Sequence, residues 1–465
     1  MLVCGLILLA LTAVGLDAQR TDNLDAFVAV AVAQGAVYLL ALGLIRRRTA
    51  SRPGLALILG VAVAMRIVAL FAPPFLSSDV YRYVWDGRVL AAGINPYRYI
   101  PTDPHLAPLR DAEIFPEINR GNYAPTIYPP AAEAIFFAAT RFSESITAIK
   151  AAMVVFEAIA IALVLSLLAG AGLPATRIII YAWHPLPLWE FAGSGHIDAA
   201  IVACVALAFW SRRRTPLPLS DRHKPVSAAE MDPGFRRDDK RLDNGFWLTG
   251  LALAGAVLVK FYPIVLFPAL WRRWGWRMPA VFAALLVLAY LPFLGVGWGV
   301  FGFLPGYLAE EGFTSGGGGF YLWSLARTVV PPGTVPDFAY LVAVAGLLGG
   351  LAVYVAWMRP GPDREVFGAV LLAGAFVVLL SPHYPWYFAW LIVFACFIPS
   401  ASLPWLTLTS FLLYLVPVGS QLVRDRHRFL VETAIYVPFL ALAALDLWRL
   451  RRPAKEQPRH GGHSD

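Results

Sequence analysis

Long apolar runs, separated by short polar loops, recur from one end of this chain to the other. Most are roughly 17–25 residues long, the length that a helix needs to cross the hydrocarbon core of a bilayer. Only 15% of the residues are charged, compared with about 25% in soluble domains. The pattern predicts an all-α polytopic membrane protein with about 12–14 transmembrane helices.

The predicted spans cover residues 1–16, 26–45, 54–76, 148–169, 176–192, 196–211, 278–297, 336–358, 365–381, 384–399, 404–420 and 430–449. The run at 246–271 differs, because it breaks at the sequence Lys260-Phe261-Tyr262-Pro263. Each half is too short to cross a membrane at about 1.5 Å per residue. The segment is therefore predicted to be a re-entrant hairpin or a helix broken at a cavity.

Basic residues gather in a few loops, and cytoplasmic loops carry an excess of Lys and Arg. The predicted cytoplasmic segments are 46–53, 212–245, 272–277, 359–364 and the tail from 449. The predicted outer segments are 74–128, 193–198, 298–335 and 382–384, with 129–142 as a juxtamembrane helix along the outer interface. The basic loops account for the net charge of +8, so no nucleic-acid partner is predicted.

One arginine cluster breaks this rule, because Arg424, Arg426 and Arg428 fall on the outer side. Either the count of spans is wrong there, or these cations bind an anionic lipid head group. The lipid bilayer is a partner of the chain in both cases.

The chain divides at changes of composition, and no internal repeat is evident. Residues 1–45 are predicted to form two N-terminal transmembrane helices, 46–211 a core with the outer loop 74–128, and 246–450 the remaining bundle. The stretches 212–245 and 451–465 lack apolar periodicity and cannot bury enough apolar surface to fold. Both are therefore predicted to be disordered.

The sequence from Ser77 to Gly87 follows directly on a predicted span. Ionisable residues at such a position are candidates for function. Asp79 is predicted either to deprotonate a sugar hydroxyl as a general base or to cap the following helix. Asp86 lies two helical turns further on, on the same face, with Arg82 between the two carboxylates. Asp86 is a candidate sugar or acceptor ligand, and a solvated ion-pair face is the alternative.

The outer loop that follows is rich in Asn, Tyr and Pro, which form rigid turns with hydrogen-bonding tips. Asn95, Tyr97 and Tyr128 are its candidate sugar-binding residues, because planar polar groups and aromatic faces recognise sugars. An ordered loop without a binding role is the alternative, although loops of this length are uncommon unless they are functional.

Lys260 stands inside an apolar segment, where a buried lysine needs an anion or a water-filled cavity. The phosphate of a lipid-linked sugar would supply that anion. The alternative is a lysine that extends its amine to the interface. The chain break at this residue favours the binding role.

Further candidates lie at other outer helix ends. His196 and Asp198 are two residues apart and do not face each other on a helix, so no metal site is predicted. His383 and Tyr384 are predicted to line a sugar pocket, with an aromatic belt at the membrane interface as the alternative. The cysteines form no CxxC, and no phosphate-binding loop is present, so no cofactor is predicted.

A carboxylate at the end of a span, followed by an aromatic-rich loop, indicates an enzyme that acts on a lipid-linked substrate. A transporter, such as a flippase for polyprenol-linked sugars, would instead need a continuous polar path across several spans. The predicted spans are mostly apolar and their polar residues gather at one face, which favours the enzyme. A non-catalytic assembly factor would tolerate the loss of Asp79.

An ordered set of short motifs carries a family resemblance: Asp79–Tyr83, Gly93–Tyr97, Ile127–Pro130, Gly195–Asp198, Lys260–Pro263 and Ser381–Tyr384. With these motifs the chain resembles the GT-C superfamily of membrane glycosyltransferases. It is most similar to glycosyltransferase family 87 and to bacterial alpha-1,6-mannopyranosyltransferases. The resemblance covers most of the chain from about residue 54 to residue 449.

The resemblance implies a multi-pass enzyme of a bacterial inner membrane, with its active site on the periplasmic face. It implies inverting transfer of a hexose, mannose by analogy, from a polyprenyl-phosphate donor to a glycan or lipid-linked acceptor. Asp79 matches the general base, and Lys260 best matches the residue that holds the donor phosphate, followed by Arg82 and the cluster from Arg424 to Arg428. Some of these enzymes carry an adjacent acidic pair, but Val80 follows Asp79 here, so a divalent metal is unsupported.

Overall fold

The computed structural model describes residues 1–46, 51–213, 235–271, 275–314, 319–331, 333–358, 361–416 and 421–451. All the regular secondary structure in this part of the chain is helical and no strand is present in it, as predicted. Seven of its helical stretches are long and apolar enough to cross a membrane: Leu2–Arg20, Leu24–Ile45, Arg52–Leu70, Ile146–Gly170, Arg277–Glu310, Phe338–Trp357 and Asp425–Leu450. The chain is a multi-pass membrane protein.

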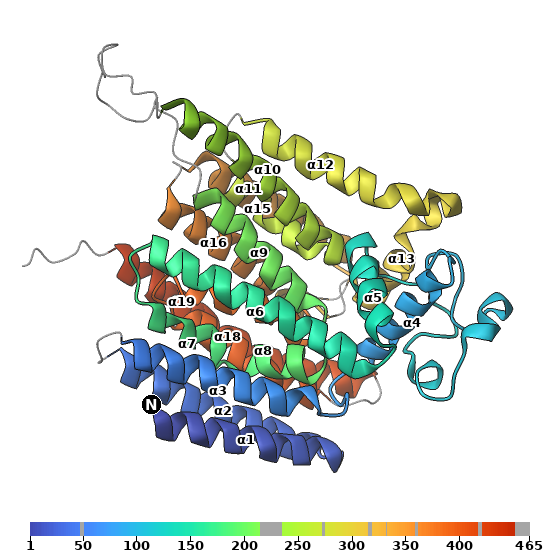
Figure 1. Cartoon of the computed structure of the whole chain (residues 1–465), viewed down its shortest axis with the longest axis horizontal. Helices are drawn as coiled ribbons and strands as arrows, with labels where there is room; N and C mark the ends of the chain where they lie inside the picture. Colours follow the sequence, from blue (N-terminus) through green and yellow to red (C-terminus); the bar gives the residue numbers. More distant parts are fainter. Residues whose placement is uncertain are drawn as a thin grey trace, which may run out of the picture.

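The first helices are α1 (Leu2–Arg20), α2 (Leu24–Ile45), α3 (Arg52–Leu70), α6 (Ile146–Gly170) and α9 (Asp198–Arg213) (Figure 1). Helix α1 packs against both α2 and α3, α3 packs against α6, and α6 packs against α9. Polar side chains mark where several of them begin, since Asn23, Ser51 and Ser145 each accept a bond from a backbone N–H in the first turn of α2, α3 and α6. The N-terminal pair is joined to the core by Gln34, which accepts a bond from the Trp189 indole at 2.7 Å.

Several predicted spans are broken into short helical pieces in the structure. Residues 176–192 fall into η3 (Ala175–Ile178), α7 (Ile179–Ala182), α8 (Pro185–Pro187) and the π-helical η4 (Leu188–Gly193). Later pieces are η8 (Pro385–Leu391), α17 (Ile392–Ala395), α18 (Ser402–Thr409) and η9 (Ser410–Leu415). Prolines at 185, 187 and 385 remove backbone donors, and broken helices are tolerated where protein surrounds them. The predicted apolar segments at these positions are helical, but each is divided into short pieces and does not form one continuous helix.

The interior also holds charge that the sequence reading did not single out. Arg66 of α3 and Glu157 of α6 form a buried ion pair at 2.8 Å. Buried charges of this kind are stable when each is paired and hydrogen-bonded, and the Arg66 guanidinium also donates to the Ala182 carbonyl at 2.8 Å. This pair joins three helical segments.

Helix α10 (Phe235–Val259) ends at the predicted break. It lies beside α12 (Arg277–Tyr290), and both run from the left-hand end of the bundle toward the right in Figure 1. Because α10 and α12 run in the same direction, the segment between them must return across the bundle. It does so through η6 (Tyr262–Leu266) and α11 (Phe267–Leu270). The chain therefore turns back at Lys260. Residues 235–245, predicted to be disordered, are helical; 214–234 and 452–465 lie outside the described residues.

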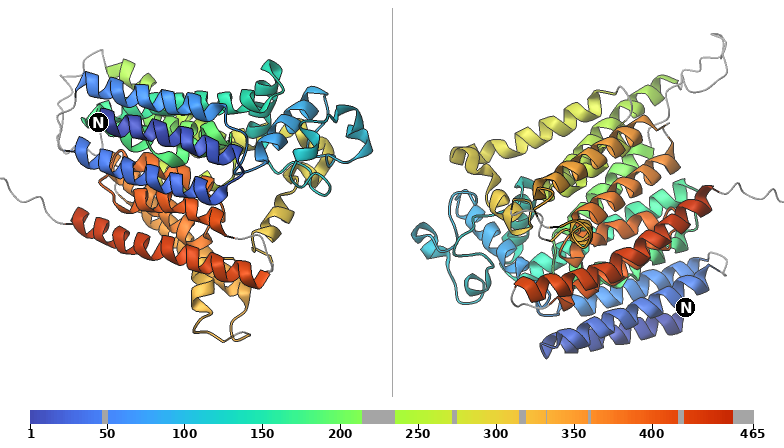
Figure 2. Two further views of the ribbon diagram at one scale, coloured as in Figure 1. Left: turned by 90° about the horizontal axis from the view of Figure 1, so that it is seen from below. Right: turned by 180° about the vertical axis from the view of Figure 1, so that it is seen from behind.

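The remaining helices complete the bundle: η7 (Leu291–Phe301), α13 (Leu304–Glu310), α14 (Tyr321–Ala326), α15 (Asp337–Trp357), α16 (Pro362–Leu380) and α19 (Gln421–Arg451). The two ends of the bundle differ (Figure 2): α4 (Asp79–Ala91), α5 (Pro130–Phe142), η1 (Pro104–Leu109) and η2 (Phe115–Glu117) project from one end, which we call the loop end. The N-terminus lies at the other end. The predicted large loop with its juxtamembrane helices is thus present as one structural unit.

Candidate active site

A cavity of about 790 Å³ opens at the loop end. Segments far apart in the sequence form its walls: the start of α4, residues 119–129, the break after α10, α13, the end of α16 and the start of η8. Its polar lining residues are Ser77, Ser78, Asp79, Arg82, Asn119, Arg120, Tyr123, Tyr128, Lys260, Tyr262, Tyr307, Glu310, Glu311, Tyr384 and Tyr387. The volume lies in the range of small-molecule sites.

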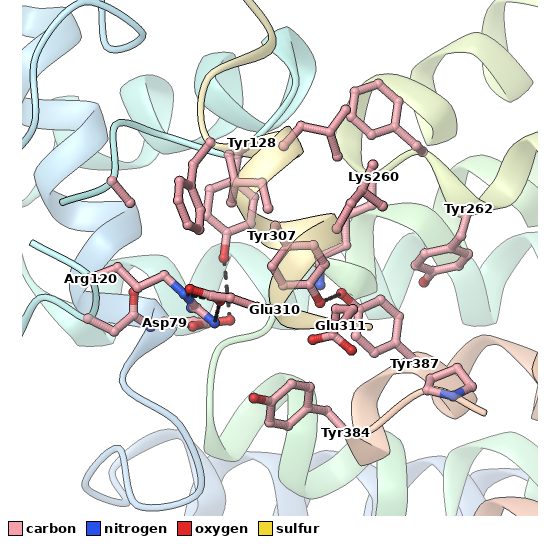
Figure 3. Close-up of a pocket in the computed structure, with 18 of the residues that line it drawn as sticks. Asp79, Arg120, Tyr128, Lys260, Tyr262, Tyr307, Glu310, Glu311, Tyr384 and Tyr387 are labelled. Carbon is pink, nitrogen blue, oxygen red and sulfur yellow. Dashed lines mark hydrogen bonds and ion pairs between the residues drawn. The ribbon is translucent and has the colours of Figure 1, made fainter. Parts of the chain in front are cut away.

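Asp79 is the first residue of α4 and lies half-buried on the cavity wall (Figure 3). Its two carboxylate oxygens accept separate bonds, one from the Asn119 amide at 2.6 Å and one from the Tyr128 hydroxyl at 3.3 Å. Both donors are neutral, so they orient the carboxylate without cancelling its charge. The backbone N–H of Asp79 donates to the Ser77 hydroxyl. The carboxylate thus faces the cavity, and its bonds to Asn119 and Tyr128 do not cap the helix.

An ion pair lies beside Asp79 and joins two walls of the cavity. Arg120 contacts Glu310 of α13 at 2.8 Å, and the Tyr123 hydroxyl donates to the same carboxylate at 3.0 Å. Burial alone would lower the pKa of Arg120, but the Glu310 carboxylate outweighs burial and raises this pKa above its ordinary value. Arg120 is therefore a permanent cation in the cavity wall.

Lys260 lies in the same cavity at the chain break (Figure 3). Its amine contacts the fully buried Asp198 carboxylate at 2.6 Å, and the Tyr262 hydroxyl donates to the other oxygen of Asp198 at 2.9 Å. The amine also lies 5.0 Å from the ring centre of Tyr387, within the range of a cation–π contact. The break after α10 thus holds one amine at the cavity surface.

Aromatic rings form the rest of the cavity wall. The hydroxyls of Tyr307 and Tyr387 are 2.6 Å apart, which joins α13 to η8. Tyr384 stacks on Trp386 with ring centres 4.5 Å apart, and His196 stacks on Trp386 at 4.1 Å. Flat ring faces beside polar groups are the surfaces that bind pyranose rings, so this wall is suited to a sugar.

The family model described as alpha-(1->6)-mannopyranosyltransferase, N-terminal domain, matches residues 8–276, more than half of the 465 residues. The chain belongs to this mannopyranosyltransferase family. The predicted enzyme class, a glycosyltransferase of the mannosyltransferase type, is confirmed. No curated protein and no solved structure matches the chain.

The matched region of this mannosyltransferase supplies only part of the cavity. It contains Asp79, Asn119, Tyr128 and Lys260. Helix α13 and the start of η8 lie beyond residue 276 and close the cavity from the other side.

Two predicted site residues are bonded to each other, Asp86 behind the cavity wall and Arg82 at its surface. Asp86 is 1% exposed and accepts a bond from Arg82 at 2.8 Å. Arg82 touches the cavity but is held by Asp86 and by the Ala124 carbonyl, to which it donates at 3.2 Å. Asp79 and Asp86 lie on one face of α4, as the spacing predicts. The part of this face around Asp86 is buried in the protein and is not a solvated ion-pair surface.

The predicted loop residues are divided between the cavity and its supports. Tyr128 lines the cavity. Tyr97 donates to the Tyr128 carbonyl at 2.7 Å, and Asn95 donates to the Phe293 carbonyl at 3.0 Å. Tyr97 and Asn95 therefore fix the loop and do not line the cavity.

The predicted histidines and one arginine of the cluster, Arg428, lie next to the cavity. His196 and Asp198 are fully buried behind Trp386 and Lys260. His383 contacts the Glu311 carboxylate at 2.8 Å and lies 3.4 Å from Arg428. Helix α19 therefore begins at the loop end, as the span count predicts. Arg426 is exposed, and the side chain of Arg424 lies outside the described residues.

Several cavity residues were not predicted from the sequence: Asn119, Arg120, Tyr262, Tyr307, Glu310 and Glu311. The adjacent acidic pair Glu310-Glu311 in a predicted outer segment was a usable signal. Asn119 and Arg120 carried no such signal, since they are ordinary loop residues whose place depends on the fold. Within the described residues, no group of three or more His, Cys, Asp or Glu side chains is placed to hold a metal ion.

Proposed function

We propose that this mannosyltransferase transfers mannose from a polyprenyl-phosphate donor to a hydroxyl of a glycan or lipid-linked acceptor, with inversion at the anomeric carbon. The reaction would take place in the cavity at the loop end, which we assign to the periplasmic face because the basic loops adjoin the opposite end. The observation that carries the proposal is Asp79, a carboxylate oriented by two neutral donors in a cavity that also contains Lys260.

The carboxylate and the amine have different roles in this proposal. The acceptor hydroxyl donates to Asp79, which takes its proton as the oxygen attacks the anomeric carbon. The bond between that carbon and the phosphate oxygen breaks on the opposite side, and the polyprenyl phosphate leaves with the bonding electrons. Lys260 stabilises the negative charge that grows on the phosphate.

The apolar side of the cavity suits the lipid chain of such a donor. Phe261, Ile264, Phe376 and Leu380 line this side, and Ile264 is 51% exposed. In a membrane, an exposed apolar side chain at a cavity opening contacts lipid. A polyprenyl chain could therefore remain among the lipids while its phosphate reaches Lys260.

A transporter of the same lipid is the alternative. The cavity favours an enzyme, because its polar residues gather at the loop end around an oriented carboxylate. A flippase needs access to the substrate from both faces of the membrane.

The test is sugar transfer by the purified protein in liposomes, with radiolabelled polyprenyl-phosphate mannose and an acceptor pool from membrane extract. Transfer by the wild type and its loss in Asp79→Asn would support the proposal, and the labelled product would identify the acceptor. If neither protein transfers any of a panel of polyprenyl-phosphate sugars, the same liposomes are assayed for movement of the lipid between leaflets. Movement without transfer would overturn the proposal.

A further inference from the structure

A group of two carboxyl side chains joined by a threonine lies directly behind the cavity, between α4 and α5. It consists of Asp86 on α4, Glu133 on α5 and Thr126 on the loop between them. The Thr126 hydroxyl lies 2.8 Å from Asp86 Oδ2 and 2.6 Å from Glu133 Oε1. Asp86 is 1% exposed, and Thr126 and Glu133 are fully buried. Nothing in the proposed reaction uses these three side chains directly.

Counting hydrogens determines the protonation of this cluster. A threonine hydroxyl has one proton to donate, yet Thr126 makes a short contact with each of two carboxyl groups. One of the two contacts must therefore be donated by a carboxylic acid. Asp86 already accepts a bond from the Arg82 guanidinium at 2.8 Å and so is the ionised member. Glu133 is then the acid.

The surroundings of Glu133 agree with this assignment. Burial, together with the nearby Asp86 carboxylate, raises the pKa of Glu133 well above its ordinary value. Of the two cations on α4, Arg82 is already bonded to Asp86, and Arg88 pairs with Asp111 and Glu144. From α6, Lys150 donates to the Ala69 and Ala72 carbonyls, and Glu157 pairs with Arg66.

Among the residues that the structure describes, the other neighbouring elements bring no further cation to Glu133. Tyr97, on the loop, is neutral and bonded to Tyr128. Tyr290, on α12, has its ring 6.5 Å from that of Tyr97. The sequence from 246 to 259 of α10 has no charged residue, and Lys260, beyond it, is paired with Asp198. Arg277 stands at the start of α12, the end of the bundle opposite the cavity.

Thr126 connects this cluster to both walls of the active-site cavity. Its hydroxyl accepts a bond from the backbone N–H of Tyr128 at 3.2 Å, and Tyr128 holds Asp79. Its carbonyl accepts a bond from the N–H of Phe303 at 3.0 Å, at the start of α13. Gly302, at φ +53°, allows that approach, since a Cβ there would overlap the Thr126 carbonyl.

We propose that Glu133 is a positioning residue that works as a neutral carboxylic acid: it donates to Thr126, Thr126 donates to Asp86, and this chain fixes the loop so that Tyr128 orients Asp79. Glu133 does not touch the substrate. The effect on transfer rests on the function proposed for Asp79, whereas the protonation of Glu133 does not.

The raised pKa of Glu133 gives the sign of a pH effect. The acid form persists at a pH above the ordinary glutamate range and is lost as the pH rises further. Loss of that proton removes the bond to Thr126 and places two anions around one hydroxyl. Tyr128 should therefore lose its fixed orientation as the pH rises through the pKa of Glu133, and not as the pH falls.

The experiment compares Glu133→Gln with Glu133→Ala, and Thr126→Val with Thr126→Ser, in the full chain. The Gln amide can still donate to Thr126, and Ser keeps the hydroxyl. At neutral pH we expect Gln and Ser to remain within about 3-fold of the wild-type kcat, and Ala and Val to lose about 10-fold or more, the scale of a displaced catalytic group. In the Gln variant the alkaline loss of activity due to Glu133 should disappear.

Infrared spectroscopy provides a readout that is independent of transfer. The wild type minus the Glu133→Gln spectrum should contain the carbonyl band of a protonated carboxylic acid at neutral pH. Absence of this band would overturn the proposal, as would equal loss of kcat in Gln and Ala variants of equal thermal stability. If no protein transfers sugar, the proposed function fails, and the infrared band still decides the state of Glu133.

Discussion

Asp79 and Asp86 lie on the same face of α4 but in two different regions of the molecule. Asp79 faces the cavity and is held by neutral donors from Asn119 and Tyr128. Asp86 is buried and paired with Arg82. The comparison shows that helical spacing places two carboxylates on one face, but the neighbouring helix decides which of them meets substrate.

Helix α5 determines which of the two carboxylates is buried, because it approaches α4 closely. A Cβ at Gly87 would lie 2.6 Å from the Phe136 carbonyl and 2.6 Å from the Thr140 hydroxyl. Only a glycine allows α5 to come so near without rearrangement. This approach buries Asp86, whereas Asp79, at the start of α4, lies at the cavity.

The largest effect is expected from exchanging each aspartate for asparagine. Asp79→Asn should lower kcat by about 10²–10⁴-fold, the usual contribution of a general base, with little change in thermal stability. Asp86→Asn leaves Arg82 buried without its counter-ion, which should cost about 3–5 kcal/mol of stability. Transfer assays and thermal unfolding in the same detergent measure both. Equal effects of the two changes on stability and on kcat would contradict the comparison.

The next test separates two roles of Lys260: binding of the donor phosphate and neutralisation of the buried Asp198 carboxylate. Lys260→Met should weaken donor binding, but it also leaves the Asp198 carboxylate buried and unpaired. The double variant Lys260→Met/Asp198→Asn removes that unpaired charge. If Lys260 binds the phosphate, the double variant should recover the stability lost by the single variant, about 3–5 kcal/mol, but not the KM for the donor. Recovery of both the stability and the KM would show that Lys260 only neutralises Asp198 and does not bind the phosphate.

A smaller effect is expected from closing the space between α4 and α5. Gly87→Ala should cost about 1–3 kcal/mol, the usual range for overpacking, because the added methyl group meets the backbone of α5. Gly93→Ala is a control at a positive φ, +74°, where no atom lies within 4 Å of the added Cβ. Thermal unfolding of the two variants separates packing from backbone strain. Unchanged stability of Gly87→Ala would show that the close approach of the two helices does not need the glycine.

The smallest effect is expected for the ion pair at the cavity wall. Arg120 and Glu310 are about a third exposed, and partly exposed pairs contribute less than about 1 kcal/mol. A double-mutant cycle with Arg120→Ala and Glu310→Ala should give a coupling energy in that range that falls with added salt. A larger coupling energy that does not depend on salt would show that this pair behaves like the buried pair Arg82–Asp86 and not like an exposed pair.

The sequence alone determined the class of the fold, the chain break at Lys260 and the enzyme class. These depend on local signals: runs of apolar residues, basic loops and short motifs that each occupy a few consecutive positions. Asp79, Tyr128, Lys260 and Tyr384 were predicted in this way and all line the cavity. Their roles in catalysis and binding remain predictions.

The tertiary structure decided which polar residues share a surface. Asn119 and Arg120 reach the cavity because the loop folds back on α4, and Tyr307 and Glu310 reach it from α13, beyond residue 300. It also moved Asp86, Asn95 and Tyr97 into supporting positions. Such placement depends on contacts between residues distant in the sequence, which local periodicity does not encode. Apolar pattern specifies that a helix forms, whereas packing specifies what each of its polar residues meets.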